Sequence, residues 1–123
     1  MMNGILWKVR FVPEESSVLI DRTNQLTIGT TDPRTKTIYL SEELQGDFLM
    51  TVFIHELAHC ALYSFGLLDR IRDMVYPDRW IEMEEFLCNF LADYGMRIFQ
   101  TAYSIIGYDA WKLIPSQLEK IVS

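Results

Sequence analysis

Basic runs, long hydrophobic stretches and histidines are scarce in this 123-residue sequence, and each of these scarcities excludes some classes of function. The formal net charge is −6, and lysine and arginine form nothing longer than alternating pairs such as Arg70 and Arg72. Nucleic acids and anionic membranes are bound by clustered positive charge, so neither partner is expected. No segment reaches the roughly 18 uninterrupted apolar residues that span a bilayer.

The N-terminus and the cysteines also exclude particular classes. Lys8 and Arg10 interrupt the apolar start of the chain, which argues against a signal peptide. Cys60 and Cys88, the two cysteines, lie within predicted helices and do not suggest a disulfide framework. We therefore expect a cytoplasmic protein. A length of 123 residues with 50% apolar content predicts a single domain over residues 1–123.

The first third of the chain predicts strands and turns. Residues 5–12 alternate apolar and charged side chains, as a half-buried strand does. Residues 26–29 and 37–40 are rich in strand-forming types and flank the turn at residues 32–34, so a hairpin is expected there. Residues 18–20 predict either a short strand or a helical turn.

Helical patterns follow. From about Asp47, the sequence FLMTVFIHELAHCALYSFG predicts a long helix that Gly66 can end in a left-handed conformation. A second long helix is expected to begin near Pro77, with Asp78 as its N-cap. A short C-terminal helix is expected around residues 116–122. The predicted fold class is α+β: a small antiparallel N-terminal sheet, followed by two principal helices and the short C-terminal helix.

The motif HELAH, residues 55–59, contains both histidines of the chain. Residues four apart on a helix share one face, so His55 and His59 can direct two imidazoles at one ion. Glu56 is turned about 100° from His55 and suits a base for a water that the metal activates. Without a cation, three polar groups on an apolar helix would be costly to bury. The motif therefore predicts a zinc site with Glu56 as the catalytic base.

A catalytic zinc usually has three protein ligands. The chain has no third histidine, so a carboxylate or a cysteine must serve. Cys60 points elsewhere on the helix and is interpreted as a small buried hydrophobe. Glu85 lies within a stripe of small or apolar residues on the second helix, where a carboxylate needs a cation. Glu85 is therefore the preferred third ligand, and Glu84 remains an alternative.

Asn89 follows Glu85 by one helical turn. It could hold an outer hydrogen bond to a ligating imidazole or carboxylate, or it could be an ordinary surface amide.

HELAH, followed after 25 residues by EFLCNFLA, resembles the ImmA/IrrE family of small zinc metallopeptidases, a branch of the gluzincins. The second helix of that family typically reads E-x-x-A-N-x-F-A, which here corresponds to Glu85, Cys88, Asn89, Leu91 and Ala92. The similarity covers roughly residues 26–95 and includes the segment GTTDPRTKTIYLSEEL. The chain is similar to the phage-encoded, mobile-element or minimal versions of the family. The resemblance implies Glu85 as the third zinc ligand and a peptide that pairs with an edge strand, expected at residues 37–40.

The leading hypothesis is a zinc-dependent metallopeptidase that hydrolyses a protein or peptide substrate. The alternative is a zinc-containing regulatory module, latent or inactive, that acts by protein–protein interaction. A purely structural zinc is disfavoured, since a closed site has no use for the base Glu56. Stabilising the oxyanion needs a further donor, and a tyrosine is the expected side chain. All six tyrosines of the chain are candidates, among them Tyr63, Tyr76, Tyr94 and Tyr103.

Overall fold

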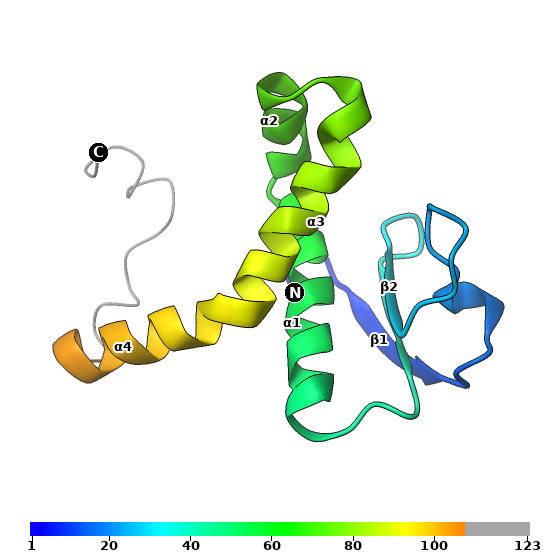
Figure 1. The fold of residues 1–123 in the computed structure, drawn as a ribbon, viewed down its shortest axis with the longest axis horizontal. Helices are drawn as coiled ribbons and strands as arrows, with labels where there is room; N and C mark the ends of the chain where they lie inside the picture. The colour runs from blue at the N-terminus through cyan, green and yellow to red at the C-terminus, as the bar shows by residue number, and fades with distance from the viewer. Residues whose placement is uncertain (108–123) are drawn as a thin grey trace. The chain divides into compact units, whose positions relative to one another are not determined.

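The computed structural model describes residues 1–107, which form three strands and a series of helices (Figure 1). The order along the chain is β1 (Lys8–Val12), the 3-10 turn η1 (Ser17–Leu19), β2 (Gly29–Asp32), β3 (Thr37–Ser41), α1 (Gly46–Ser64), α2 (Leu67–Met74), the 3-10 turn η2 (Pro77–Arg79), α3 (Trp80–Phe90), the π-helical turn η3 (Leu91–Gly95) and α4 (Met96–Ile106). A three-stranded sheet followed by helices confirms the predicted α+β class.

The chain divides into two compact units. The first, Met1–Asp93, contains every element from β1 to α3. The second begins at Tyr94, and its described part contains α4, on which Ile98, Phe99 and Ile105 are exposed. A single metallopeptidase domain over residues 1–123 stays a prediction. The C-terminal helix expected around residues 116–122 lies outside the described residues.

The sheet has the order β1–β3–β2. β2 pairs with β3 antiparallel, with Gly29 opposite Leu40, which confirms the predicted hairpin. β1 pairs with β3 in parallel, so the sheet is mixed and the prediction of an antiparallel sheet was wrong. The reason is that the chain reverses between β1 and β2, and reverses again into β3. β3 is thus the central strand, so the expectation that residues 37–40 form a free edge was also wrong.

The segment before β2 forms its own tight turn. Ile20 and Leu26 pair in an isolated antiparallel bridge, and the Asp21 N–H donates to the Gln25 carbonyl at 2.9 Å. Leu26 of the expected first arm pairs in this bridge, and the Thr27 N–H donates to the Leu19 carbonyl at 2.9 Å, so β2 begins only at Gly29. The preceding segment is a 3-10 turn, which confirms the helical alternative for it, and its Leu19 is fully buried.

The main core lies between the central strand and α1. Ile38, Leu40, Leu44 and Cys60 form a buried cluster. Partly buried side chains surround this cluster: Met2, Trp7, Leu49, Val52, Phe53 and Leu57. The principal helix–sheet contacts join α1 to β2 and β3. Consequently Val9 and Phe11 on β1 are 43% and 53% exposed, although the alternating pattern had predicted a half-buried strand.

Gly66 separates α1 from a helix that the sequence reading missed. Its φ of +71° is the left-handed conformation expected at the end of α1. α2 then begins at Leu67, and the two helices are bent by 87°. Apolar residues at Leu67, Leu68, Ile71 and Met74 give α2 its amphipathic spacing, and Ile71 is buried. The bend turns the chain toward α3, which contacts both α1 and α2.

The second predicted helix is interrupted. Pro77 begins the 3-10 turn η2, and α3 has Arg79 rather than Asp78 at its N-cap, so the predicted cap was wrong. The expected continuous helix also passes through the π-helical turn η3 before α4.

Among residues 1–107, no single helix has the length and apolar composition of a membrane span, although α1 and α2 taken together pass that test.

Candidate metal centre

α1 brings the two imidazoles together. His55 and His59 lie one turn apart, and their Nε2 atoms are 3.1 Å from each other. Their side chains are only 18% and 11% exposed. Two neutral nitrogens with lone pairs at this distance would repel each other, so the arrangement favours a proton or a cation between them.

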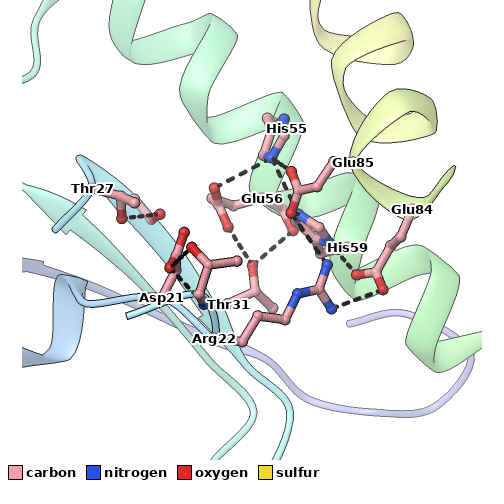
Figure 2. A network of polar contacts seen from close by, with 11 residues as sticks. Asp21, Arg22, Thr27, Thr31, His55, Glu56, His59, Glu84 and Glu85 are labelled. Carbon is pink, nitrogen blue, oxygen red and sulfur yellow. Dashed lines mark hydrogen bonds and ion pairs between the residues drawn. The ribbon is translucent and has the colours of Figure 1, made fainter. Parts of the chain in front are cut away.

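Glu85 reaches this point from α3. Its Oε2 lies 3.1 Å from His55 Nε2, and its Oε1 lies 3.3 Å from His59 Nε2 (Figure 2). One ligand atom from each of these three residues lies within 4.8 Å of the others. Two imidazoles and a carboxylate are a donor set that zinc accepts, and iron, nickel or manganese would also accept it. His55, His59 and Glu85 therefore form a group that could hold a metal ion.

Glu84 holds the other side of His59. Its Oε2 lies 2.6 Å from His59 Nδ1, the nitrogen that faces away from Glu85. In a metal-binding histidine, the N–H of the other ring nitrogen usually donates a hydrogen bond to a carboxylate or a carbonyl, which fixes the ring orientation and its tautomer. Glu84 is the carboxylate in that position. The two neighbouring glutamates therefore contact opposite nitrogens of the His59 ring, Glu84 at Nδ1 and Glu85 at Nε2. The sequence reading had treated Glu84 as a rival ligand and had not assigned it this contact.

Arg22 contacts both glutamates from the turn before β2. Its Nη1 donates to Glu84 Oε1 at 3.0 Å, and its Nη2 donates to Glu85 Oε1 at 3.2 Å (Figure 2). The carboxylates offset the effect of burial and raise the pKa of the Arg22 guanidinium. Sequence reasoning missed Arg22, because nothing near residue 22 indicates that it contacts residues more than sixty positions away.

The charges of this cluster favour a cation. Hydrogen bonds with His55 and then His59 hold the pKa of Glu85 well below its usual range. Burial opposes ionisation of Glu84, but hydrogen bonds from His59 and Arg22 still lower its pKa. Burial also disfavours the charged form of His59, yet its contacts with Cys88, Glu84 and Glu85 raise its pKa to about 12. In the metal-free protein the site thus retains a proton, and a divalent ion must displace that proton.

Glu56 lies beside the triad. Its side chain is 7% exposed, and its Oε2 is 3.9 Å from His55 Nε2. Oε1 accepts a hydrogen bond of 2.8 Å from the Thr31 hydroxyl on β2. Burial raises the pKa of Glu56, while the Thr31 hydrogen bond and the two histidines act in the opposite direction. A carboxyl with a raised pKa, next to residues that could hold a metal ion, is suited to accept and release protons.

Gly29 allows β2 to approach this carboxylate. A Cβ atom at Gly29 would lie 3.0 Å from Val52 Cγ1 and 3.4 Å from Glu56 Oε2. Any larger residue would therefore push against the side chain of Glu56 or against the helix that carries it.

The group opens into a cleft of about 1090 Å³. The cleft is lined by all four residues of β2, by the triad, and by Glu56, Glu84 and Arg22. Asn89 also lines it but is exposed, and in the described part of the chain no hydrogen bond of its side chain is found. The outer contact proposed for Asn89 thus stays a prediction, whereas Glu84 makes a contact of that kind.

The tyrosines are distributed unevenly around this cleft. Tyr63 lines it, as does Tyr39, whereas Tyr76 is 83% exposed and is not among the lining residues. Tyr94 and Tyr103 belong to the second unit. Tyr63 already contacts Lys36, whose ammonium lies 4.8 Å from the ring centre.

No protein-family model matches this chain, and no curated protein matches it. The resemblance to ImmA/IrrE peptidases therefore depends only on HELAH, the residues of the second helix and the segment GTTDPRTKTIYLSEEL.

Proposed function

We propose that this chain is a zinc-dependent peptidase in which His55, His59 and Glu85 hold the ion and Glu56 is the base. One observation carries the proposal. The ligand atoms of the triad converge within 4.8 Å, and the buried carboxylate of Glu56 lies 3.9 Å from His55 Nε2. A structural zinc site would have no need of such a base.

The two oxygens of Glu56 have different tasks. Thr31 holds Oε1, so the carboxylate cannot rotate freely, and Oε2 is the oxygen on the side of His55. In the proposed reaction, Oε2 accepts a proton from the attacking water and later passes it to the nitrogen of the leaving amine. Zinc, when bound, supplies a Lewis acid that polarises the scissile carbonyl and lowers the pKa of water.

β2 is suited to align the substrate. It pairs with β3 on one side, and all four of its residues line the cleft. An extended peptide could add to its other side by main-chain hydrogen bonds, with the scissile bond beside Glu56. The proposed substrate is therefore a protein segment in extended conformation, and the proposed location is the cytoplasm.

Metal analysis by mass spectrometry tests the site. His59→Ala and Glu85→Ala should lose zinc that the wild type retains. Glu82→Ala is the matched control, because Glu82 lies on the same helix but pairs with Arg79 at 2.8 Å. If Glu85→Ala retained zinc and Glu84→Ala lost it, the assignment of the third ligand would be wrong.

A library of fluorogenic peptides tests the chemistry. The zinc-loaded wild type should cleave a subset of the library, while Glu56→Gln should retain zinc and lose cleavage. Cleavage by Glu56→Gln at the wild-type rate would contradict the role of the base. Zinc binding by a wild type that cleaves no peptide, yet captures one protein tightly, would favour the regulatory module instead.

A further inference from the structure

We propose that Arg22 is a positioning residue, which holds Glu84 and Glu85 by two simultaneous hydrogen bonds and thereby orients both carboxylates toward the histidines. This inference rests on the proposed zinc site. It adds to the site a residue that comes from neither the HELAH helix nor α3.

The two contacts divide the carboxylate oxygens in a useful way. Arg22 donates a hydrogen bond to Oε1 of Glu84, and His59 donates one to Oε2 of the same carboxylate. Each oxygen of Glu84 thus has its own donor, so the carboxylate is held at both ends. Glu84 accepts a hydrogen bond from the Nδ1–H of His59. By holding Glu84, the Arg22 guanidinium therefore also fixes the orientation of the imidazole whose Nε2 faces Glu85.

The contact with Glu85 leaves its other oxygen for a metal. Arg22 donates to Oε1, whereas Oε2 lies 3.1 Å from His55 Nε2 and accepts no hydrogen bond from Arg22. Outer partners of this kind orient ligating carboxylates. A guanidinium suits the task because its planar fork presents parallel N–H groups, and a lysine ammonium does not.

An exposed ion pair usually contributes little, so the exposure of these groups matters. The side chain of Arg22 is 43% exposed, and that of Glu85 is 40% exposed. Glu84 is only 13% exposed, and it joins Arg22 and His59 in one network. The contribution should therefore appear mainly in the geometry of the site and little in the free energy of unfolding.

The backbone fixes the start of the Arg22 side chain. Asp21 Oδ1 accepts hydrogen bonds from Thr23 N at 2.8 Å and from Gln25 N at 3.1 Å, which closes the turn around Arg22. The bridge between Ile20 and Leu26 closes the base of the same turn.

The other cations beside the cleft are engaged elsewhere. Arg34 lies 3.7 Å from Asp32, and Arg72 lies 3.4 Å from Asp69. Within residues 1–107, Arg22 is thus the arginine that forms ion pairs with both of the glutamates that face the histidines.

The test compares Arg22→Ala, Arg22→Lys and Arg79→Ala with the wild type. Arg79 is the matched control, since it pairs with Glu82 on the same helix. Zinc affinity is measured by competition with a chromophoric chelator. We expect Arg22→Ala to bind zinc about 10- to 100-fold more weakly, the usual loss for an outer partner. Arg22→Lys should recover only part of that loss, and Arg79→Ala should match the wild type.

A spectroscopic measurement separates orientation from folding. Visible absorption of bound Co²⁺ reports ligand number and geometry, so the bands should change in Arg22→Ala and remain unchanged in Arg79→Ala. Circular dichroism of each metal-free variant checks the fold, and Arg22→Gln replaces Arg22→Ala if the latter does not fold.

Each contrary outcome has a distinct meaning. Unchanged zinc affinity and Co²⁺ bands in Arg22→Ala, or tighter zinc binding, would overturn the positioning role. Full recovery in Arg22→Lys would overturn the claim of two simultaneous bonds, because charge alone would suffice. A wild type that binds neither Zn²⁺ nor Co²⁺ would instead refute the proposed function on which this inference rests.

Discussion

The Thr31 hydroxyl donates to Glu56 Oε1 across 2.8 Å and so joins the edge strand of the sheet to the helix that carries the two histidines. A hydrogen bond to the ionised form of an acid lowers its pKa, and this one counteracts the effect of burial on Glu56. The strand therefore contributes to the acid–base chemistry of the helix as well as to the wall of the cleft.

Replacing Thr31 with valine tests that contribution. Loss of the donor should raise the pKa of Glu56 further, so the base form is available only at higher pH. We expect the acidic limb of the pH profile of kcat/KM to move to higher pH. Thr30→Val is the control, because the Thr30 hydroxyl donates to the Val18 carbonyl at 2.8 Å. Equal profiles for the two variants would contradict the role of Thr31.

The raised pKa of Glu56 also predicts a pH-dependent stability. The folded, metal-free protein binds this proton more tightly than the unfolded chain does. The resulting stabilisation is complete below the pKa of the unfolded chain and is lost as pH rises through the folded pKa. Glu56→Gln, which cannot ionise, should therefore gain stability relative to wild type as the pH rises above the pKa of an unfolded glutamate, about 4.3. Urea unfolding with a chelator present measures the difference in unfolding free energy between the two proteins. A difference that does not change with pH would contradict the prediction.

Gly29 should be intolerant of a side chain. In Gly29→Ala, the new methyl group would lie 3.0 Å from Val52 Cγ1, so the Val52 side chain must move by a few tenths of an ångström. Overpacking of this kind costs about 1–3 kcal/mol of unfolding free energy. Val52→Ala removes the nearer of the two contacts. Gly29→Ala should therefore lower the unfolding free energy less in the Val52→Ala background than in the wild type. Purely additive losses in urea unfolding would show that the two positions do not conflict.

Ser64 should contribute more to the free energy of unfolding than an exposed serine does. Trp7 Nε1 donates to Ser64 Oγ at 2.8 Å, and Ser64 is 6% exposed at the end of α1. In Ser64→Ala, the partly buried indole N–H loses its acceptor, which should cost about 1–3 kcal/mol. Ser104→Ala is the comparison, because its hydroxyl donates to the Thr101 carbonyl on an exposed helix face. Chemical unfolding monitored by tryptophan fluorescence should separate them, and equal midpoints would refute the argument.

Local patterns predicted the elements that local chemistry determines. HELAH and Gly66 were sufficient to place the helix that presents the histidines, because side-chain spacing and a left-handed glycine are properties of adjacent residues. The hairpin was also predicted, but its first arm was shifted, since Leu26 and Thr27 pair with the segment at Leu19 and Ile20 and the pairing with β3 begins at Gly29. α2 was missed even though Leu67, Leu68 and Ile71 offered an amphipathic signal.

Long-range contacts could not be predicted in the same way. The parallel pairing of β1 with β3 depends on the path of the whole segment between them. The division of labour between Glu84 and Glu85 depends on how α3 approaches His59, and helical spacing alone had favoured one glutamate over the other. Arg22 had no local signal, because its partners lie on α3.

One consequence follows from the placement of His55 and His59 on one helix and of Glu85 on another. The imidazoles keep their spacing as long as α1 is intact, so an ion bound by all three groups would cross-link α1 to α3. Any ligand that binds only the folded state adds stability, about 2.7 kcal/mol at a free concentration of one hundred times its Kd. The supply of that ion would then affect how long the chain survives proteolysis, in addition to any activity that depends on the ion.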